Sequence, residues 1–328
     1  MTGLCDSFQR PVNYLRISIT DRCNLRCIYC MPVDGVQMMS HADVLTYEEI
    51  YTVVAAAAEM GISKVRLTGG EPLVRLGLPQ LVEMLSSIPG IDDIAMTTNG
   101  TLLGQYAAEL KQAGLRRVNV SLDTLRPERF GEITRGRFSL DDVLAGITTA
   151  REVGLNPVKI NVVVMAGIND DEVIDFAART IDDGWHVCFI EFMPVYDILR
   201  PDIRFVPAED IRQHLSVLGE LKPYGPPLGN GPARYFKLAD AAGSIGFITP
   251  ISDHFCFQCN RLRLTADGML RPCLLSDEEI DLKGPLRQEI SSTNLRRLIE
   301  KAVARKPRAH RLAAGQGPGK RPMTQVGG

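Results

Sequence analysis

Three cysteines close together near the N-terminus constrain this chain more than any other feature. Cys23, Cys27 and Cys30 lie in the run Cys-Asn-Leu-Arg-Cys-Ile-Tyr-Cys, so three thiolates share one short loop and can share one metal centre. Structural zinc sites are closed by four ligands, and iron–sulfur clusters are usually held by four cysteines. A cluster held by three would leave one iron open to a ligand that is not protein. A zinc knuckle or a set of buried thiols is the alternative.

The composition indicates a soluble globular protein whose cysteines bind metal. Of the 328 residues, 45% are hydrophobic and 23% are charged, and the net charge of -2 gives no general attraction to nucleic acid or membrane. We see no signal peptide and no apolar stretch near the roughly 20 residues of a membrane-spanning helix. We therefore expect a cytoplasmic protein. In the reducing cytoplasm cysteines stay reduced, so the two cysteine groups are expected to bind metal and not to form disulfides. Cys188 lies in an apolar run and is predicted to be a core residue.

Residues 14–195 alternate predicted strands with amphipathic helices. We predict strands at 14–20, 64–68, 93–98, 116–121, 157–164 and 185–192. One helix begins with a capping box of Thr46 and Glu49 and ends at Gly61; another begins at Ser139 with Asp142. The alternation predicts a parallel sheet with right-handed crossovers.

Nearly every predicted strand carries polar side chains on one face. In the first strand Arg16 and Ser18 alternate with apolar residues. The same holds for Arg66 and Thr68, Asn119 and Ser121, Lys159 and Asn161, and Glu191 and Met193. Parallel sheets covered on both faces are continuously apolar, so one face lines a space for solvent or ligand. A closed barrel filled by bulky side chains does not fit. We predict an α/β fold, an incomplete (β/α)6 barrel with the active site inside; an open sheet with one wet face is the alternative.

A second group of three cysteines, Cys256, Cys259 and Cys273, lies in a C-terminal α+β extension. His254 could complete a zinc ribbon there. Two equally incomplete triads instead suggest two clusters, each offering an iron to a small molecule. The extension follows a segment rich in Pro and Gly, and contains predicted strands at 233–238 and 244–248 and a helix at 294–306. The composition of residues 307–328 predicts disorder.

Arginines beside the second triad indicate an anionic ligand. Arg261 and Arg263 alternate with leucines, so both guanidinium groups leave one face of a strand and suit phosphate oxygens. Arg16 and Arg66 are predicted to face the same cavity. In the run Thr-Gly-Gly-Glu-Pro at 68–72, adjacent glycines allow close backbone approach to a ligand, and an unpaired Glu71 carboxylate could hold an ammonium group.

These motifs together resemble one family. The two triads, Thr-Gly-Gly-Glu-Pro, Asn-Arg-Leu-Arg-Leu at 260–264 and the closing Gly327-Gly328 are similar, over essentially the whole chain, to the GTP 3′,8-cyclases of molybdenum cofactor biosynthesis. These are radical S-adenosylmethionine (SAM) enzymes. The resemblance implies two [4Fe-4S] clusters, of which the first cleaves SAM to a 5′-deoxyadenosyl radical. That radical takes hydrogen from the ribose 3′ carbon of GTP, and the ribose carbon then attacks carbon 8 of guanine. The second cluster holds the guanine edge.

The resemblance also implies roles for individual residues. The first triad holds the radical-generating cluster, and the second triad holds the other. The residues near SAM are Tyr29, Gly70, Ser121 and Met193. The residues that contact GTP are Arg16, Arg66, Thr97, Lys159, Arg261, Leu262 and Arg263. The tail, with His310, Met323 and the catalytic pair Gly327 and Gly328, becomes a mobile functional segment that folds into the barrel mouth.

The same resemblance predicts organisation and partners. We expect a radical SAM core at 1–195, an extension at 196–306 and a functional tail at 307–328. The implied partners are an electron donor such as flavodoxin or ferredoxin and the downstream cyclic pyranopterin phosphate synthase, with a homodimer as a candidate assembly and no nucleic acid or membrane. The alternatives are a peptide-modifying radical SAM enzyme with an auxiliary cluster, and a zinc ribbon whose basic tail contacts nucleic acid.

Overall fold

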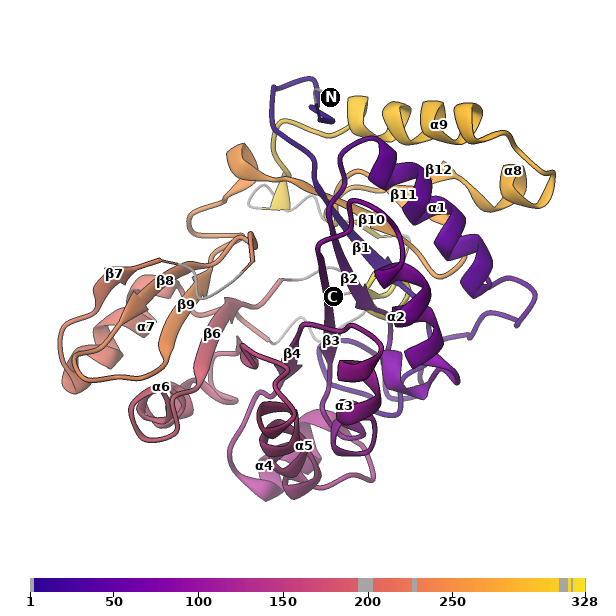
Figure 1. Ribbon diagram of the computed structural model, residues 1–328. Coiled ribbons are helices and arrows are strands. Elements are labelled where there is room, and N and C mark those ends of the chain that lie inside the picture. Colours follow the sequence, from indigo (N-terminus) through magenta and orange to yellow (C-terminus); the bar gives the residue numbers. More distant parts are fainter. Residues whose placement is uncertain (1–2, 194–202, 226–228, 313–317, 320, 328) are drawn as a thin grey trace.

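The structure is a computed structural model that describes residues 3–193, 203–225, 229–312, 318–319 and 321–327. Its core contains six strands in sequence order (Figure 1). They are β1 (Tyr14–Ser18), β2 (Lys64–Thr68), β3 (Asp93–Thr98), β4 (Arg117–Ser121), β5 (Lys159–Val164) and β6 (His186–Glu191). All six predicted strands are confirmed, with ends that differ by no more than two residues.

Helices join these strands, and the predicted capping boxes set where two of them begin. Thr46 accepts a hydrogen bond from the Glu49 amide at the start of α1 (Tyr47–Glu59), and Glu49 accepts one from the Thr46 amide. Ser139 and Asp142 do the same for α5 (Leu140–Glu152). The remaining helices are α2 (Leu78–Ser86), α3 (Leu103–Gln112), α4 (Pro127–Thr134), α6 (Val173–Asp182), α7 (Ala208–Leu215), α8 (Lys283–Arg287), α9 (Ser292–Ala304) and α10 (Met323–Val326).

The C-terminal extension lengthens the sheet at both edges. The strand order is β12-β11-β10-β1-β2-β3-β4-β5-β6-β9-β8-β7. β10 is parallel to β1 and β9 is parallel to β6, while the outer strands are antiparallel. The added strands are β7 (Lys222–Tyr224), β8 (Arg234–Lys237), β9 (Ser244–Ile248), β10 (Arg261–Leu264), β11 (Met269–Arg271) and β12 (Ile280–Asp281). The predicted incomplete barrel is confirmed, and the pairing of β10 with β1 brings the second triad beside it.

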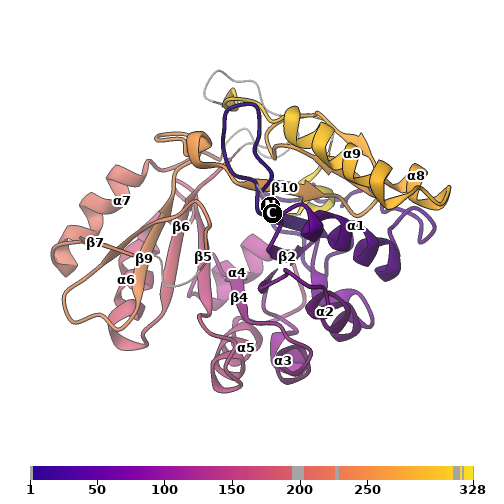
Figure 2. The ribbon, with the colours of Figure 1, turned by 45° about the horizontal axis from the view of Figure 1, so that its top comes forward.

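Helices cover the outer side of the curved sheet and leave the inner side for the site. Figure 2 shows α1, α2, α3, α5 and α6 following the outer arc. Apolar strand residues such as Leu15, Ile17, Leu67, Val120 and Ile160 are at most 1% exposed and belong to one large hydrophobic core. Because side chains alternate along a strand, the residues between them face the inner side.

The tail contains packed structure at residues 321–327. Thr324 and Val326 of α10 are buried, and α10 contacts β1. The disorder predicted from composition is therefore wrong for this part of the tail. A short segment needs no hydrophobic core of its own when it packs against the core of the barrel. No helix in the described ranges combines the length and hydropathy that a membrane crossing needs.

Candidate active site

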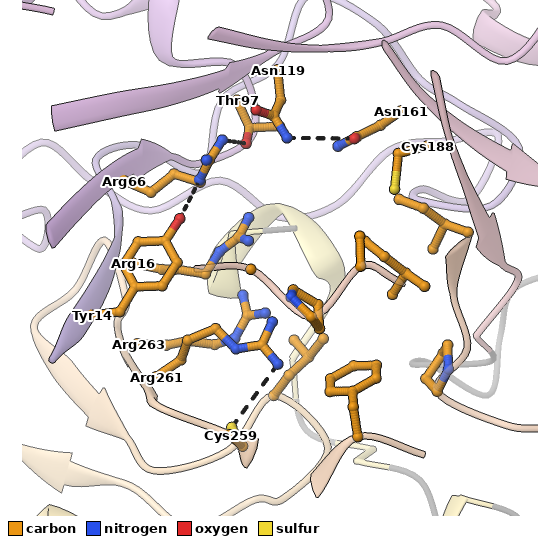
Figure 3. Close-up of a pocket in the computed structure, with 18 of the residues that line it drawn as sticks. Tyr14, Arg16, Arg66, Thr97, Asn119, Asn161, Cys188, Cys259, Arg261 and Arg263 are labelled. Atoms are coloured by element: carbon orange, nitrogen blue, oxygen red, sulfur yellow. Dashed lines mark hydrogen bonds between the residues drawn. The ribbon is translucent and has the colours of Figure 1, made fainter. Parts of the chain in front are cut away.

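A cavity lies inside the curve of the sheet (Figure 3). Its wall combines residues of β1 to β6 with β8, β10, the second triad and part of the tail. The polar residues predicted to face inward that line it are Arg16, Arg66, Asn119, Lys159 and Asn161. The predicted polar inner face is thus confirmed for β1, β2, β4 and β5, and Thr97 adds a polar group from β3.

Strand β6 departs from the predicted pattern. Cys188 is buried, as predicted, and it also lines the cavity together with Ile190. Glu191 does not belong to the inner polar face as predicted, since its buried carboxylate accepts hydrogen bonds from the amides of Ile251 and Ser252 and fixes the turn after β9. Met193, beyond the end of the strand, does line the cavity.

Buried cations converge on the cavity. Arg66 donates to the Tyr14 hydroxyl at 2.5 Å and to Thr97 Oγ1 at 3.2 Å. Nε of Arg16 is buried and has no hydrogen-bond partner among the described residues. The Arg16 pKa lies well below its usual value, mainly because the side chain is buried and secondly because the positive charge of Arg263 is nearby. Clustered buried cations are costly without an anion, so the site suits a polyanionic ligand.

Two further side chains shape the cavity around Lys159. Lys159 Nζ donates to the Tyr235 hydroxyl at 2.9 Å and lies 4.8 Å from the centre of its ring. Burial, followed by Arg117, lowers the Lys159 pKa to about 7. Arg117 is held by Asp93 at 2.5 and 3.2 Å. Arg117 was missed, although its alternation with Asn119 along β4 indicates an inward position; Tyr235 comes from distant β8 and has no comparable sequence signal.

The first cysteine loop follows β1. Burial raises the pKa of Cys23 to about 11 and also raises those of Cys27 and Cys30. The Leu25 amide and the Asn99 side chain donate to Cys23 Sγ at 3.4 and 3.9 Å. Among the described residues, no three Cys, His, Asp or Glu side chains form a site for a single metal ion. Three thiols on one loop, with N–H donors directed at the sulfur of Cys23, fit a cluster, which would deprotonate the thiols on binding.

The Thr-Gly-Gly-Glu-Pro loop packs directly against the segment that leads into the first triad. A Cβ at Gly70 would clash with the carbonyl of Arg22, so the close approach made there is between two protein backbones. The Glu71 carboxylate accepts hydrogen bonds from Thr98, Asn99 and Leu73 at 2.7–3.0 Å. The prediction of an unpaired carboxylate at Glu71 is therefore wrong. Burial raises the Glu71 pKa to about 7.

The residues predicted to lie near SAM share one edge of the sheet. Gly70, Ser121 and Met193 lie at or just beyond the carboxyl ends of parallel strands, as does the first cysteine loop. Tyr29 donates to Asp123 Oδ2 at 2.6 Å, and Asp123 Oδ1 accepts from the Val163 amide. Burial raises the Asp123 pKa to about 6. Sequence reasoning missed Asp123, which orients Tyr29.

The second triad opens onto the same cavity. Lys306 Nζ donates to Cys259 Sγ at 3.5 Å and the Leu275 amide donates to Cys273 Sγ at 3.4 Å. Burial disfavours the Cys259 thiolate, but Arg261 and Lys306 outweigh it and lower the Cys259 pKa to about 6. These donors fit cluster ligation. His254, the candidate fourth zinc ligand, packs its ring edge-on against His310, with 5.8 Å between ring centres.

The remaining predicted residues separate into cavity and core positions. Arg261 and Arg263 line the cavity as predicted, whereas the Leu262 side chain is in the hydrophobic core, so only its main chain can serve a ligand.

The tail reaches the same space. Its residues His310 and Met323 line the cavity. The Gly327 carbonyl accepts a hydrogen bond from Arg263, and a Cβ at Gly327 would clash with Thr68. Gly328 lies outside the described residues.

Comparison with known proteins identifies the family. The radical SAM superfamily model matches residues 17–179, and the Molybdenum Cofactor Synthesis C model matches residues 185–312. The GTP 3′,8-cyclase of Pelotomaculum thermopropionicum is 54% identical over 325 residues, which cover 98% of this chain and 99% of that protein. The chain belongs to the GTP 3′,8-cyclase family. The enzyme of that name from Moorella thermoacetica is 52% identical over 324 residues, again covering 98% and 99% of the two chains.

Solved structures share the fold of this GTP 3′,8-cyclase family member at low sequence identity. Streptococcus suis SuiB bound to S-adenosylmethionine matches with a TM-score of 0.62 at 14% identity, over 87% of this chain and 68% of SuiB. SuiB bound to its precursor peptide SuiA matches with a TM-score of 0.53 at 17% identity, over 62% and 45%. These matches support the radical SAM fold.

Proposed function

We propose that this chain converts GTP to (8S)-3′,8-cyclo-7,8-dihydroguanosine 5′-triphosphate, the first step of molybdenum cofactor biosynthesis, inside the cavity. One observation carries the proposal: a single cavity joins the second cysteine triad to a convergent set of buried cations, with the first triad at the carboxyl edge of the same sheet. Such a site offers cluster ligands and a counter-charge for a triphosphate together. The sequence identity of 54% and 52% to two GTP 3′,8-cyclases, over 98% of this chain, supports the same reaction.

The first triad and its surroundings are proposed to serve SAM. Bound there, a [4Fe-4S] cluster and SAM would supply the 5′-deoxyadenosyl radical that starts the reaction. Cys23, Cys27 and Cys30 are the proposed cluster ligands. Tyr29, Gly70, Ser121 and Met193 are the proposed SAM contacts. The hydrogen bond to Asp123 would orient Tyr29, and the packing of Gly70 on the Arg22 carbonyl would hold the loop at the barrel edge.

The cations and the second triad are proposed to hold GTP. The proposed contacts are Arg16, Arg66, Thr97, Lys159, Arg261 and Arg263, together with the Leu262 main chain. Arg66 is oriented by Tyr14 and Thr97, which supports its role as a fixed phosphate ligand. Cys256, Cys259 and Cys273 are the proposed ligands of a second [4Fe-4S] cluster that anchors the guanine. Gly327 and Gly328 are proposed to complete the site at the barrel mouth.

Organisation and partners follow as part of the same proposal. Reductive SAM cleavage consumes an electron, so a donor such as flavodoxin or ferredoxin is required, and cyclic pyranopterin phosphate synthase would receive the product. We propose a cytoplasmic location, a core at 1–195, an extension at 196–306 and a tail at 307–328; a homodimer is a candidate assembly. A peptide-modifying reaction is less supported, because the buried cations suit a phosphorylated substrate better than a peptide.

The direct test uses anaerobically reconstituted protein. We expect about eight irons per chain, as two four-iron clusters require. With SAM, dithionite and GTP deuterated at the 3′ carbon, 5′-deoxyadenosine should carry deuterium and form in step with the cyclic product. Formation of unlabelled 5′-deoxyadenosine at the same rate with and without GTP would contradict the proposal. Product formation from a peptide instead of GTP would support the alternative.

A further inference from the structure

An ion-pair network holds the C-terminal tail at Arg321. The Arg321 guanidinium donates to both oxygens of Asp267 at 3.1 and 2.9 Å and to Glu279 at 2.7 and 3.0 Å. The three side chains are only 14–20% exposed. Asp267 lies in the turn between β10 and β11, and Glu279 lies just before β12. One side chain of the tail is therefore tied to two separate connections of the extension by four charge-assisted hydrogen bonds.

The tail is held again six residues further on, at Gly327, inside the barrel. Gly327 lies against Ser18 and Thr68, and its carbonyl accepts a hydrogen bond from Arg263. The short helix α10 spans most of the distance between the two points. Between the two points Thr324 and Val326 are buried and α10 contacts β1, so the polar attachments at the two ends act together with this packing.

The outer attachment also reaches the second cysteine site. Glu279 Oε1 accepts a hydrogen bond from Arg271 at 2.6 Å as well as from Arg321. Arg271 is almost completely buried, lies on β11 opposite Arg263 of β10, and precedes Cys273 by two residues. Glu279 thus connects the tail to β11, which ends two residues before Cys273 of the second triad.

We propose that Arg321 is a positioning residue that latches the tail onto the β10–β12 strands, so that Gly327 is held beside Arg263 in the cavity. The latch itself follows from the contacts of Asp267, Glu279 and Arg321. Its consequence for turnover rests on the proposed function. Loss of the latch should release residues 322–327 while the barrel, the clusters and the GTP-binding cations stay in place.

The test compares two arginines of the same region by hydrogen exchange in the reconstituted holoenzyme. Arg321→Gln should raise amide exchange in residues 323–327 by at least about tenfold, the effect of losing one charged hydrogen bond. The matched control is Arg305→Gln, which removes the same charge from an exposed pair with Glu278 at 3.3 Å and should leave the tail unchanged. Iron content and Tm should match the parent in both variants. Asp267→Asn should reproduce the effect, and the double variant should be no worse than Arg321→Gln alone.

Turnover gives a second readout. Arg321→Gln should lower the rate of product formation by at least about tenfold while the Kd for GTP changes by less than about twofold. Unchanged tail exchange in both Arg321→Gln and Asp267→Asn would overturn the latch. Raised exchange with parental turnover would overturn the positioning role. If the parent enzyme does not turn over GTP, the proposed function fails, and the exchange comparison still decides whether the latch exists.

Discussion

The two cysteine triads have the same ligand count but opposite electrostatic surroundings. In the first loop burial raises the thiol pKa values, and the nearby carboxylates Glu71 and Asp123 raise them further. At the second site, Arg261 and Lys306 overcome the effect of burial and lower the Cys259 pKa to about 6. Equal sequence signals thus occupy an acidic environment in one case and a basic one in the other.

This difference matches a division of labour between the sites. Cluster potentials depend on net charge and on hydrogen bonds to sulfur. Carboxylates beside the first triad favour a low potential, which suits an electron donor to SAM. Cations beside the second triad stabilise the Cys259 thiolate, although burial raises the Cys256 pKa, and they also attract an anionic substrate to the same wall. We therefore expect the second site to bind substrate and the first to perform reduction.

Cys27→Ser is expected to have the largest effect, because it removes the function of the first triad and leaves the second triad intact. Loss of one ligand from the first triad should remove 5′-deoxyadenosine formation to below detection, while about four irons remain at the second site. The loop lies outside the strands and helices, so the fold should persist. Cys5→Ser, at an exposed cysteine, is the control and should retain full iron and activity. Parental 5′-deoxyadenosine formation by Cys27→Ser would show that the first triad is not the SAM site.

Arg261→Ala tests whether the positive charge beside the second triad binds the phosphates of GTP. Each charged hydrogen bond to phosphate contributes about 1.5–3 kcal/mol, so the Kd for GTP should rise by roughly tenfold to 150-fold. Titration of GTP and of guanosine, each in the presence of SAM, is the measurement. Affinity for guanosine and for SAM should change little. Equal losses for GTP and guanosine would indicate a damaged fold instead of a lost phosphate contact.

Local sequence signals predicted both the fold and most of the site. The capping boxes at Thr46 and Ser139 and the alternation on β1 depend on neighbouring residues, so they can be read from the chain. Cysteine spacing is equally local. The prediction for Glu191 failed because its partners, Ile251 and Ser252, lie about sixty residues further on.

The parts that sequence reasoning missed depend on contacts between distant segments. Tyr235 reaches Lys159 only because β8 and β9 extend the sheet beyond β6. Arg321 contacts Glu279 and Asp267, which lie 42 and 54 residues earlier in the chain, in the connections on either side of β11. Composition alone therefore predicted disorder for residues 321–327, which pack against the barrel.

Lys159 gives the smallest predicted effect and extends the comparison to pH. Burial, followed by Arg117, lowers the Lys159 pKa to about 7, so the free enzyme loses this positive charge as the pH rises through 7. If GTP binds the protonated form, its Kd should rise about fivefold from pH 7 to pH 8, with proton uptake on binding below one per chain. Isothermal titration in buffers of different ionisation enthalpy measures both.

Lys159→Arg is the matched control for this pH dependence. Arginine keeps the charge throughout this range, so the variant should bind GTP with only the dependence that the phosphates themselves contribute. The difference between parent and Lys159→Arg then isolates the lysine. The direction is fixed by the sign of the shift: a lowered lysine pKa weakens phosphate binding on the alkaline side and leaves binding below pH 6 nearly unchanged. If the Kd for GTP depends on pH in the same way in both proteins, Lys159 stays protonated in the free enzyme. Burial and Arg117 would then lower the Lys159 pKa less than the structure indicates.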